Sequence, residues 1–438
     1  MKTSKLTEGK IFNKLVLFSL PMIAGNMLQQ VYNLVDTFVV GRFIGADALA
    51  AVGSAYTLMI FITSVIIGLC MGSGAYFSAD FGGGRKQELK QDIWLSFWFI
   101  LAVSMLISFI VYPAMDGILK LLRTPAELME MTREYVSVVF AGIIFVFLYN
   151  FFAFLLRAMG NSKTPLMFLA ISAIMNIVLD IYFVVGLEKG VGGAALATVI
   201  SQAFAGIGMA AYAFAKVPAM RRVNVATLWS GARMKQIIFN DLATGLQQSV
   251  MNFGILMIQG LVNSFGAVVM AGFAAAVKID TLAYMPAQEF SNAYSIFVSQ
   301  NYGAQEKERI KEGTRLAVIV SVVFCAAVSV FIFLLSKQLM GIFISADEVA
   351  VITEGARYLK IEGAAYIGIG ILFLWYAYFR GINRPQVSLL LTIISLGTRV
   401  LLAYTLAPNT SLGVVAIWMA IPIGWALADL VGLAIYRK

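Results

Sequence analysis

The stretch FLLRAMGN, residues 154–161, returns in altered form as AYFRGINR at residues 377–384, an offset of 223. Other landmarks of the 438-residue chain keep nearly this spacing: FGGGRKQE from Phe81 and YGAQEKER from Tyr302, Tyr135 and Tyr358, and Gly190 and Gly413. Several landmarks at almost one offset indicate an internal repeat. We therefore expect a chain built from two similar halves.

The composition places both halves in a membrane. Hydrophobic residues make up 60% of the chain and charged residues 13%, with a mean hydropathy of +0.86. A soluble domain of this size could not cover so much apolar surface. Apolar runs of roughly 20 residues, long enough to cross a bilayer, recur at 15–44, 47–78, 92–114, 131–157, 165–187, 191–215, 237–263, 266–300, 314–336, 354–379, 386–407 and 411–435.

We predict an all-α polytopic membrane protein with twelve transmembrane helices in two pseudo-symmetric six-helix bundles. The predicted domains are an N-lobe at 1–215, a cytoplasmic linker at 216–236 and a C-lobe at 237–438. Most of the 32 Lys and Arg residues fall on alternate loops, which the positive-inside rule places in the cytoplasm. The multi-pass chain should lie in the plasma membrane with both termini cytoplasmic. Six spans per half give a parallel repeat, typical of transporters whose site lies near the bilayer midplane.

The composition also argues against several functions. The chain has no His and only two Cys, Cys70 and Cys325, both in apolar runs, so a disulfide framework is not expected. The excess of basic residues, 32 against 23 acidic ones, belongs to the cytoplasmic loops, so no nucleic acid partner is expected. No soluble ATPase domain is present. We expect a protein that is not an enzyme, that has no cofactor beyond a coupling ion, and that works as a monomer in the lipid bilayer.

A carboxylate interrupts an apolar span at Asp36, within VYNLVDTFVVGRFIG at 31–45. Counting about 1.5 Å per helical residue, Asp36 and Asp180 reach the outer half of the N-lobe. Asn176 precedes Asp180 by one helical turn, and Thr198 lies near the outer end of the next span. We expect these four side chains to meet at one level.

Such a group suits ion coupling. Two desolvated carboxyl groups close together cannot both ionise easily, so the pair can carry a proton. With the Asn and Thr oxygens it equally suits a Na+ ion. Acidic residues inside a membrane are functional by default. The alternative is that each acid only bonds a neighbouring helix.

The C-terminal half does not repeat this cluster, because the offset of 223 carries Asn176 onto Arg399. A buried Arg keeps its proton and must pair or face water. Arg399 is then a counter-ion for Glu289 or Asp280, part of the lining of a central substrate cavity, or half of a structural salt bridge.

Other candidates have both a functional and a structural interpretation. Pro21 inside span one is either a hinge or a packing feature. Four further residues either line an adaptable substrate cavity or serve helix packing and lipid contact; they are Tyr32, Met59, Tyr149 and Phe151. Glu289 and Arg399 are also candidates for the lining of the substrate cavity. GLCMG at 68–72 has small residues four apart and predicts close helix packing.

Over essentially its whole length the chain resembles the multidrug and toxic compound extrusion (MATE) family. The resemblance rests on SLPMIAGNMLQQVYNLVDTFVVGRFIG at 19–45, RAMGNSKTP at 157–165 and NIVLD at 176–180. It implies export of cationic, amphipathic compounds in exchange for H+ or Na+. Asp36, Asn176, Asp180 and Thr198 are similar to the N-lobe cation site of the DinF-like branch, and Pro21 matches the proline at which its span one bends. The NorM-like branch has an acid on span seven, where GLQQSVMNFG at 245–254 carries only amides.

Two rival functions remain. A flippase for lipid-linked polysaccharide or peptidoglycan precursors shares the two-bundle architecture, but it should have a strongly cationic cavity for pyrophosphate. A channel or sensor would need no counter-ion. The acidic N-lobe favours the antiporter.

Overall fold

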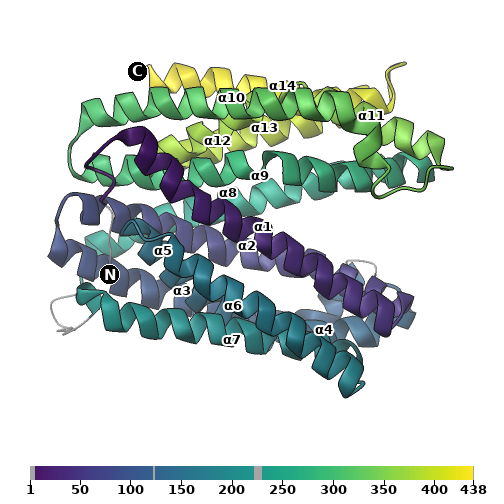
Figure 1. The fold of residues 1–438 in the computed structure, drawn as a ribbon, viewed down its shortest axis with the longest axis horizontal. Helices are drawn as coiled ribbons and strands as arrows, with labels where there is room; N and C mark the ends of the chain where they lie inside the picture. Colours follow the sequence, from purple (N-terminus) through teal and green to yellow (C-terminus); the bar gives the residue numbers. More distant parts are fainter. Residues whose placement is uncertain (1–4, 122–123, 221–228, 438) are drawn as a thin grey trace. The chain divides into compact units, whose positions relative to one another are not determined.

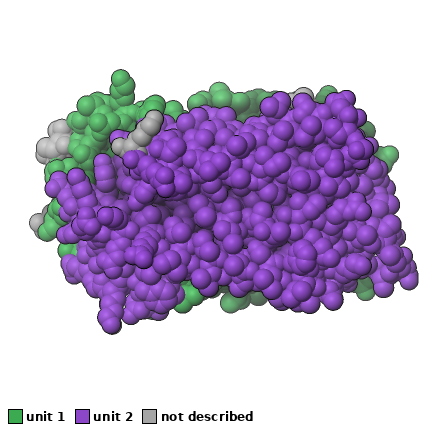
Figure 2. All heavy atoms as spheres, turned by 90° about the horizontal axis from the view of Figure 1, so that it is seen from above, with its two compact units in different colours: residues 1–6, 20–245 green, residues 7–19, 246–438 purple. Residues whose placement is uncertain are grey.

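The computed structural model describes residues 5–121, 124–220 and 229–437, and these residues form helices joined by short turns. They fall into two compact units, coloured green and purple in Figure 2. Unit 1 comprises Met1–Leu6 and Leu20–Gly245, and unit 2 comprises Thr7–Ser19 and Leu246–Lys438. The all-α fold predicted from the sequence is therefore confirmed. Residues 221–228 of the predicted linker lie outside the described residues.

Unit 1 holds most of α1 and the first half of α8, with six whole α-helices between them (Figure 1). The bounds are α1 Ile11–Phe43, α2 Ala46–Gly82, α3 Lys86–Leu121, α4 Met129–Ala141, α5 Ile143–Ala158, α6 Lys163–Asp180, α7 Gly190–Lys216 and α8 Gly231–Asn263. Two single turns, Ala126–Leu128 and Pro218–Met220, are 3-10 helices, and Ile181–Gly186 is π-helical.

Unit 2 continues with the second half of α8 and six further helices. These are α9 Ala267–Gly303, α10 Lys307–Met340, α11 Val349–Gly363, α12 Tyr366–Gly381, α13 Pro385–Leu406 and α14 Val414–Tyr436.

The helices account for the twelve predicted spans. Nine are long and apolar enough to cross a bilayer among the described residues, and two bent pairs, α4 with α5 and α11 with α12, bring the number to eleven. The helix α8 covers the remaining predicted span, 237–263, with a more polar sequence. Large apolar side chains such as Phe109 and Leu430 are exposed, as expected of a surface that faces lipid.

The two bent pairs display the internal repeat. Helices α4 and α5 meet at Gly142 with a bend of 46°, and α11 and α12 meet at 364–365 with a bend of 54°. Gly142 plus the offset of 223 is residue 365. Tyr135 and Tyr358 occupy equivalent positions on α4 and α11, before each bend. The repeat read from the sequence is thus also a repeat of helix geometry.

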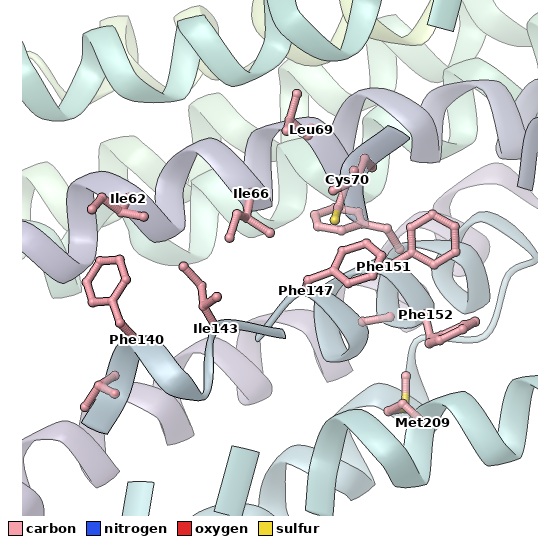
Figure 3. Packing of buried hydrophobic residues seen from close by; sticks show 14 of the residues in the cluster. Ile62, Ile66, Leu69, Cys70, Phe140, Ile143, Phe147, Phe151, Phe152 and Met209 are labelled. Atoms are coloured by element: carbon pink, nitrogen blue, oxygen red, sulfur yellow. The ribbon is translucent and has the colours of Figure 1, made fainter. Parts of the chain in front are cut away.

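Each unit has its own apolar core. In unit 1 the aromatic rings of α5 pack against those of α3 and α2, and Figure 3 shows Phe147, Phe151 and Phe152 among them. In unit 2, Phe273 stacks on Trp418 with the ring of Tyr358 at their edge. These cores fix the helices that carry the polar side chains described below.

The division between the units differs from the predicted domain boundaries at both ends of the N-lobe. On α1 it falls between Ser19 and Leu20, one residue before Pro21, so the first turns of α1 belong to unit 2. On α8 it falls between Gly245 and Leu246, so the first half of α8 belongs to unit 1. Each unit therefore includes part of a helix from the other half of the chain.

The first half of α8 is held to α2 by backbone packing. A Cβ at Gly68 would lie 2.6 Å from the Cα of Gly245, and one at Gly72 would lie 2.8 Å from the Cα of Asp241. Glycine allows this close approach because it has no side chain. Close packing at the GLCMG motif is thereby confirmed.

Polar contacts reinforce the same packing. Ser73 Oγ donates to Asp241 Oδ2 at 2.6 Å. Arg233 donates through Nη2 to Asp80 at 2.6 Å and through Nη2 and Nε to Asp92. Both carboxylates are buried, and a buried charge is tolerated when it is paired and hydrogen-bonded. The start of α8 is therefore an integral part of unit 1.

Candidate functional site

Unit 1 contains a cavity of about 250 Å³ bordered by α1, α2, α5, α6 and α7. Its walls mix aromatic, amide and hydroxyl groups. The cavity-lining residues with polar side chains are Gln29, Tyr32, Asn33, Tyr56, Thr63, Tyr149, Asn150, Ser172, Asn176, Thr198, Ser201 and Gln202. A cavity with many polar groups inside a membrane bundle is a candidate site for an ion or a polar ligand.

Asp36 and Asp180 meet beside this cavity. Asp36 lies on α1 and is half-buried, whereas Asp180 is the fully buried last residue of α6. Their carboxyl groups are within interaction range of one another. The chain continues from Asp180 into the π-helical segment Ile181–Gly186, and such segments are frequent at functional sites.

Asn176 and Thr198 complete the group expected from the sequence. Asn176 lies one turn before Asp180 on α6, Thr198 lies on α7, and both are buried and line the cavity. The structure thus brings the four predicted residues from three helices into one region of unit 1.

Several polar atoms of this group are buried without a hydrogen-bond partner among the described residues. They are Asp36 Oδ1, both carboxylate oxygens of Asp180, and both polar atoms of the Asn176 amide. Buried polar groups are normally paired, so each such atom calls for an explanation. A proton shared by the two carboxyl groups, or a cation among the oxygens, would supply the missing interactions.

The number of acids decides which ions suit the site. The described residues contain no group of three or more His, Cys, Asp or Glu side chains able to hold a metal ion. Two carboxyl groups, one amide and one hydroxyl can hold a proton or one hard monovalent cation bound through oxygen.

Tyr135 on α4 belongs to this cluster, although the sequence did not identify it as a site residue. It is buried and lies within interaction range of Asp36, Asp180 and Thr198. In the sequence Tyr135 stands out only because it is equivalent to Tyr358 in the internal repeat. We name Asp36, Tyr135, Asn176, Asp180 and Thr198 the unit 1 acidic cluster.

The predicted substrate-cavity residues of unit 1 have different positions. Tyr32, Met59 and Tyr149 line the cavity, and the Tyr149 hydroxyl donates to the backbone carbonyl of Pro165 at 3.3 Å. Phe151 is instead fully buried in the aromatic core (Figure 3). The structure therefore places Phe151 outside the cavity, because it is two residues from Tyr149 and points to another face of α5.

Unit 2 has a smaller cavity of about 120 Å³ lined by Asp280 of α9, Glu362 of α11 and Arg399 of α13. Arg399 acts electrostatically on both carboxyl groups. Of the partners considered for Arg399, the structure brings Asp280 close. Glu289 lies elsewhere on α9, where it accepts a hydrogen bond from the Asn292 amide at 3.2 Å and interacts electrostatically with Arg380. It is not among the residues that line this cavity.

Tyrosine hydroxyls hold Asp280 in place. Tyr366 donates to Asp280 Oδ1 at 2.6 Å, and Tyr358 lies at 3.5 Å from Oδ2. Glu362, Tyr358 and Tyr366 were not predicted as site residues, because they lie around the bend between α11 and α12 rather than at positions that repeat the acids of unit 1. We name Asp280, Tyr358, Glu362, Tyr366 and Arg399 the unit 2 charged cluster.

Comparison with known proteins agrees with the repeat and the fold. The MatE family model matches residues 21–182 and 243–405, two segments that begin 222 residues apart (243 − 21) and end 223 apart (405 − 182). The probable multidrug resistance protein YpnP of Bacillus subtilis is 29% identical over 398 residues, 90% of this chain and 88% of that protein. The probable multidrug resistance protein NorM of Thermotoga maritima is 25% identical over 418 residues, 94% of this chain and 89% of that protein.

A solved structure has the same fold. It is described as the outward-facing conformation of a multidrug resistance MATE family transporter of the MOP superfamily. It matches with a TM-score of 0.92 at 25% identity, over 100% of this chain and 97% of that chain.

Proposed function

Because this chain belongs to the MatE family, we propose that it is a secondary multidrug efflux transporter, an antiporter that exports cationic amphipathic compounds in exchange for H+ or Na+. The observation that carries the proposal is the pair of half-buried Asp36 and fully buried Asp180, which meet in a membrane bundle with carboxyl oxygen atoms that are buried and have no hydrogen-bond partner among the described residues. Its relatives with multidrug resistance names support the exported class.

The unit 1 acidic cluster binds the coupling ion. A proton converts the carboxyl pair into one donor and several acceptors, and Na+ would be held by the oxygens of Asp36, Asn176, Asp180 and Thr198. In either case the bound ion removes the repulsion between two carboxylates. The helices α1, α6 and α7 can then pack more closely around the cluster than they can when it is empty.

The ion drives transport only if it binds the two conformations of the carrier with different affinity. We infer that the loaded cluster favours outward release of substrate and that the empty cluster favours the inward-facing state. Pro21 is the proposed hinge, because it removes a backbone donor inside α1 next to the point where α1 passes from unit 2 to unit 1.

The cavity of unit 1 is the proposed substrate site. Its aromatic rings and flexible Met59 suit flat or irregular organic cations. Asn176 and Thr198 line this cavity and also belong to the acidic cluster, so substrate and ion share part of one wall. Binding of one therefore affects binding of the other.

The remaining expectations complete the proposal. The chain acts in the plasma membrane with both termini in the cytoplasm, as a monomer, without an enzymatic step and without a cofactor beyond H+ or Na+. Its partners are small organic cations and the bilayer, and no nucleic acid is involved.

The flippase is the second candidate. One observation favours it, namely the cationic side chain of Arg399 at the cavity of unit 2. Two carboxyl groups at the same cavity offset that charge, and a pyrophosphate needs several cations. The antiporter is therefore preferred.

The test is efflux of a fluorescent organic cation from proteoliposomes, with a pH gradient and a Na+ gradient imposed separately. Uphill movement driven by one gradient supports the antiporter and identifies its ion. Lack of response to both gradients, together with scrambling of a labelled lipid-linked oligosaccharide, would replace it by the flippase. Dye movement down its own gradient alone would indicate a channel.

A further inference from the structure

The two clusters are built around equivalent tyrosines. Tyr135 on α4 lies within interaction range of Asp36 and Asp180, and Tyr358 on α11 lies within range of Asp280 and Glu362. Residue 135 plus the repeat offset of 223 is 358. Each cluster also borders its own cavity, of about 250 Å³ in unit 1 and about 120 Å³ in unit 2. Both halves therefore hold a pair of carboxyl groups close to equivalent tyrosines, although the acids themselves come from α1 and α6 in unit 1 and from α9 and α11 in unit 2.

The clusters differ in one fixed charge. In unit 1 the two carboxyl groups interact with each other, whereas in unit 2 both carboxyl groups also interact electrostatically with the cationic Arg399. Arg399 stands at the position equivalent to Asn176, so the repeat replaces a neutral amide by a guanidinium. Arg remains protonated under all physiological conditions, which makes this charge permanent.

The hydrogen bonds of unit 2 agree with an ionised Asp280 whose negative charge the Arg399 guanidinium offsets. Asp280 accepts from Tyr366 at 2.6 Å, with a second hydroxyl, that of Tyr358, at 3.5 Å. Arg399 is 91% buried, since its exposed fraction is 9%. Its Nε and the Oε2 atom of Glu362 have no hydrogen-bond partner among the described residues. The guanidinium thus balances the acids across the cavity through its field, without a bond through Nε.

A charge held at the cavity also repels other cations. Two like charges in a partly desolvated cavity repel much more strongly than they do in water, because the effective dielectric constant is lower there. A mobile Na+ entering the cavity would meet this repulsion while losing its own hydration. The carboxyl groups of unit 2 therefore have little attraction left for an exchangeable cation.

We propose that Arg399 is a built-in cation that takes the place of a coupling ion in unit 2 and thereby confines the binding of exchangeable cations to unit 1. The inference rests on the proposed function only for the role of unit 1. Its test is a binding measurement that does not depend on transport.

The experiment uses the full chain with both acids of unit 1 neutralised, Asp36→Asn with Asp180→Asn. Binding of radiolabelled Na+ and Rb+ to the purified protein is measured by equilibrium dialysis. The double variant should bind neither ion saturably. Adding Arg399→Gln should create saturable binding of at least one of the two ions, and a further Glu362→Gln change should remove it.

Two controls separate charge from structure. Arg399→Lys keeps a cation at the cavity and should create no binding. Arg357→Gln changes a half-exposed arginine that pairs with Glu354 and should also create none. Size-exclusion profiles of each variant report whether it is folded.

Two results overturn the proposal. One is saturable binding in the double variant with Arg399 intact that Glu362→Gln abolishes, a measurement that needs no change at Arg399. The other is a folded Arg399→Gln variant that gains no binding of either ion. Failure of gradient-driven efflux in the wild-type protein would count against the antiporter and would leave this test unchanged.

Discussion

The carboxyl group of Asp36 on α1 lies within interaction range of the carboxyl group of Asp180, the last residue of α6. Two anions in a buried site repel, so the pair needs a proton or another cation to be stable. In the proposed antiport mechanism this need links an ion gradient to a change in conformation.

Replacing either acid should uncouple the transporter. Asp36→Asn and Asp180→Asn each remove one charge and keep the side-chain size, so the variants should fold while gradient-driven dye efflux falls to the level of protein-free liposomes. Asp116→Asn is the matched control, because Asp116 is an exposed acid that pairs with Arg133, and it should keep full efflux. Uphill efflux by either site variant would exclude its acid from ion coupling.

Tyr149 and Phe151, two residues apart on α5, should give opposite phenotypes. Tyr149→Leu removes one aromatic side chain from the lining of the cavity, so dye binding measured by fluorescence anisotropy should weaken several-fold with little change in stability. Phe151→Ala empties a fully buried aromatic site, which costs about 3–5 kcal/mol of unfolding free energy, and should lower the midpoint of thermal unfolding. If Phe151→Ala weakened dye binding as much as Tyr149→Leu without loss of stability, the cavity assignment would be wrong.

Pro21→Ala should slow the transport cycle. The change restores a backbone donor inside α1 and favours a straight helix by up to about 3 kcal/mol. Dye should still bind, while the rate of uphill efflux drops. Pro113→Ala serves for comparison, since Pro113 lies inside α3, a helix that belongs wholly to unit 1. Equal rates in the Pro21 variant and the wild-type protein would argue against a hinge there.

Two glycines on α2 should respond differently to one methyl group. At Gly72 a Cβ would lie 2.7 Å from Asp241 Oδ1 and 2.8 Å from its Cα, so Gly72→Ala forces α2 and α8 apart and should cost about 1–3 kcal/mol. A Cβ added at Gly53 would meet no atom within 4 Å, and Gly53→Ala should be neutral or stabilising by up to about 1 kcal/mol. Thermal unfolding in detergent compares the two, and equal midpoints would contradict the close packing.

The spans, the repeat and all members of the unit 1 acidic cluster except Tyr135 could be predicted because they depend on local rules. Hydropathy sets span length, and a constant rise per residue sets depth, which was sufficient to bring Asp36, Asn176 and Asp180 to one level. The cavity position considered for Phe151 is wrong, and packing in the core is its role, because depth does not specify which face of a helix a residue occupies.

In the unit 2 charged cluster the sequence suggested the pairing of Arg399 with Asp280, but the same reasoning could not predict Tyr358, Glu362 and Tyr366. Glu362 and Tyr366 flank the break between α11 and α12, and a break changes the direction of side chains in a way that straight-helix counting ignores. The position of the unit boundaries inside α1 and α8 depends on packing partners, such as Gly68 with Gly245, that are distant in sequence.

The exchange of helix segments between the halves has a consequence for how such a protein evolves. Unit 1 includes the start of α8, from the second half of the chain, and unit 2 includes residues 7–19, from the first. A gene fragment that encodes the first half would lack a structural piece of its own bundle and would expose the surface of α2 at Gly68 and Gly72, against which α8 packs. Once a duplicated ancestor had acquired this exchange, fission into independent genes would be selected against, and the halves would be inherited as one reading frame.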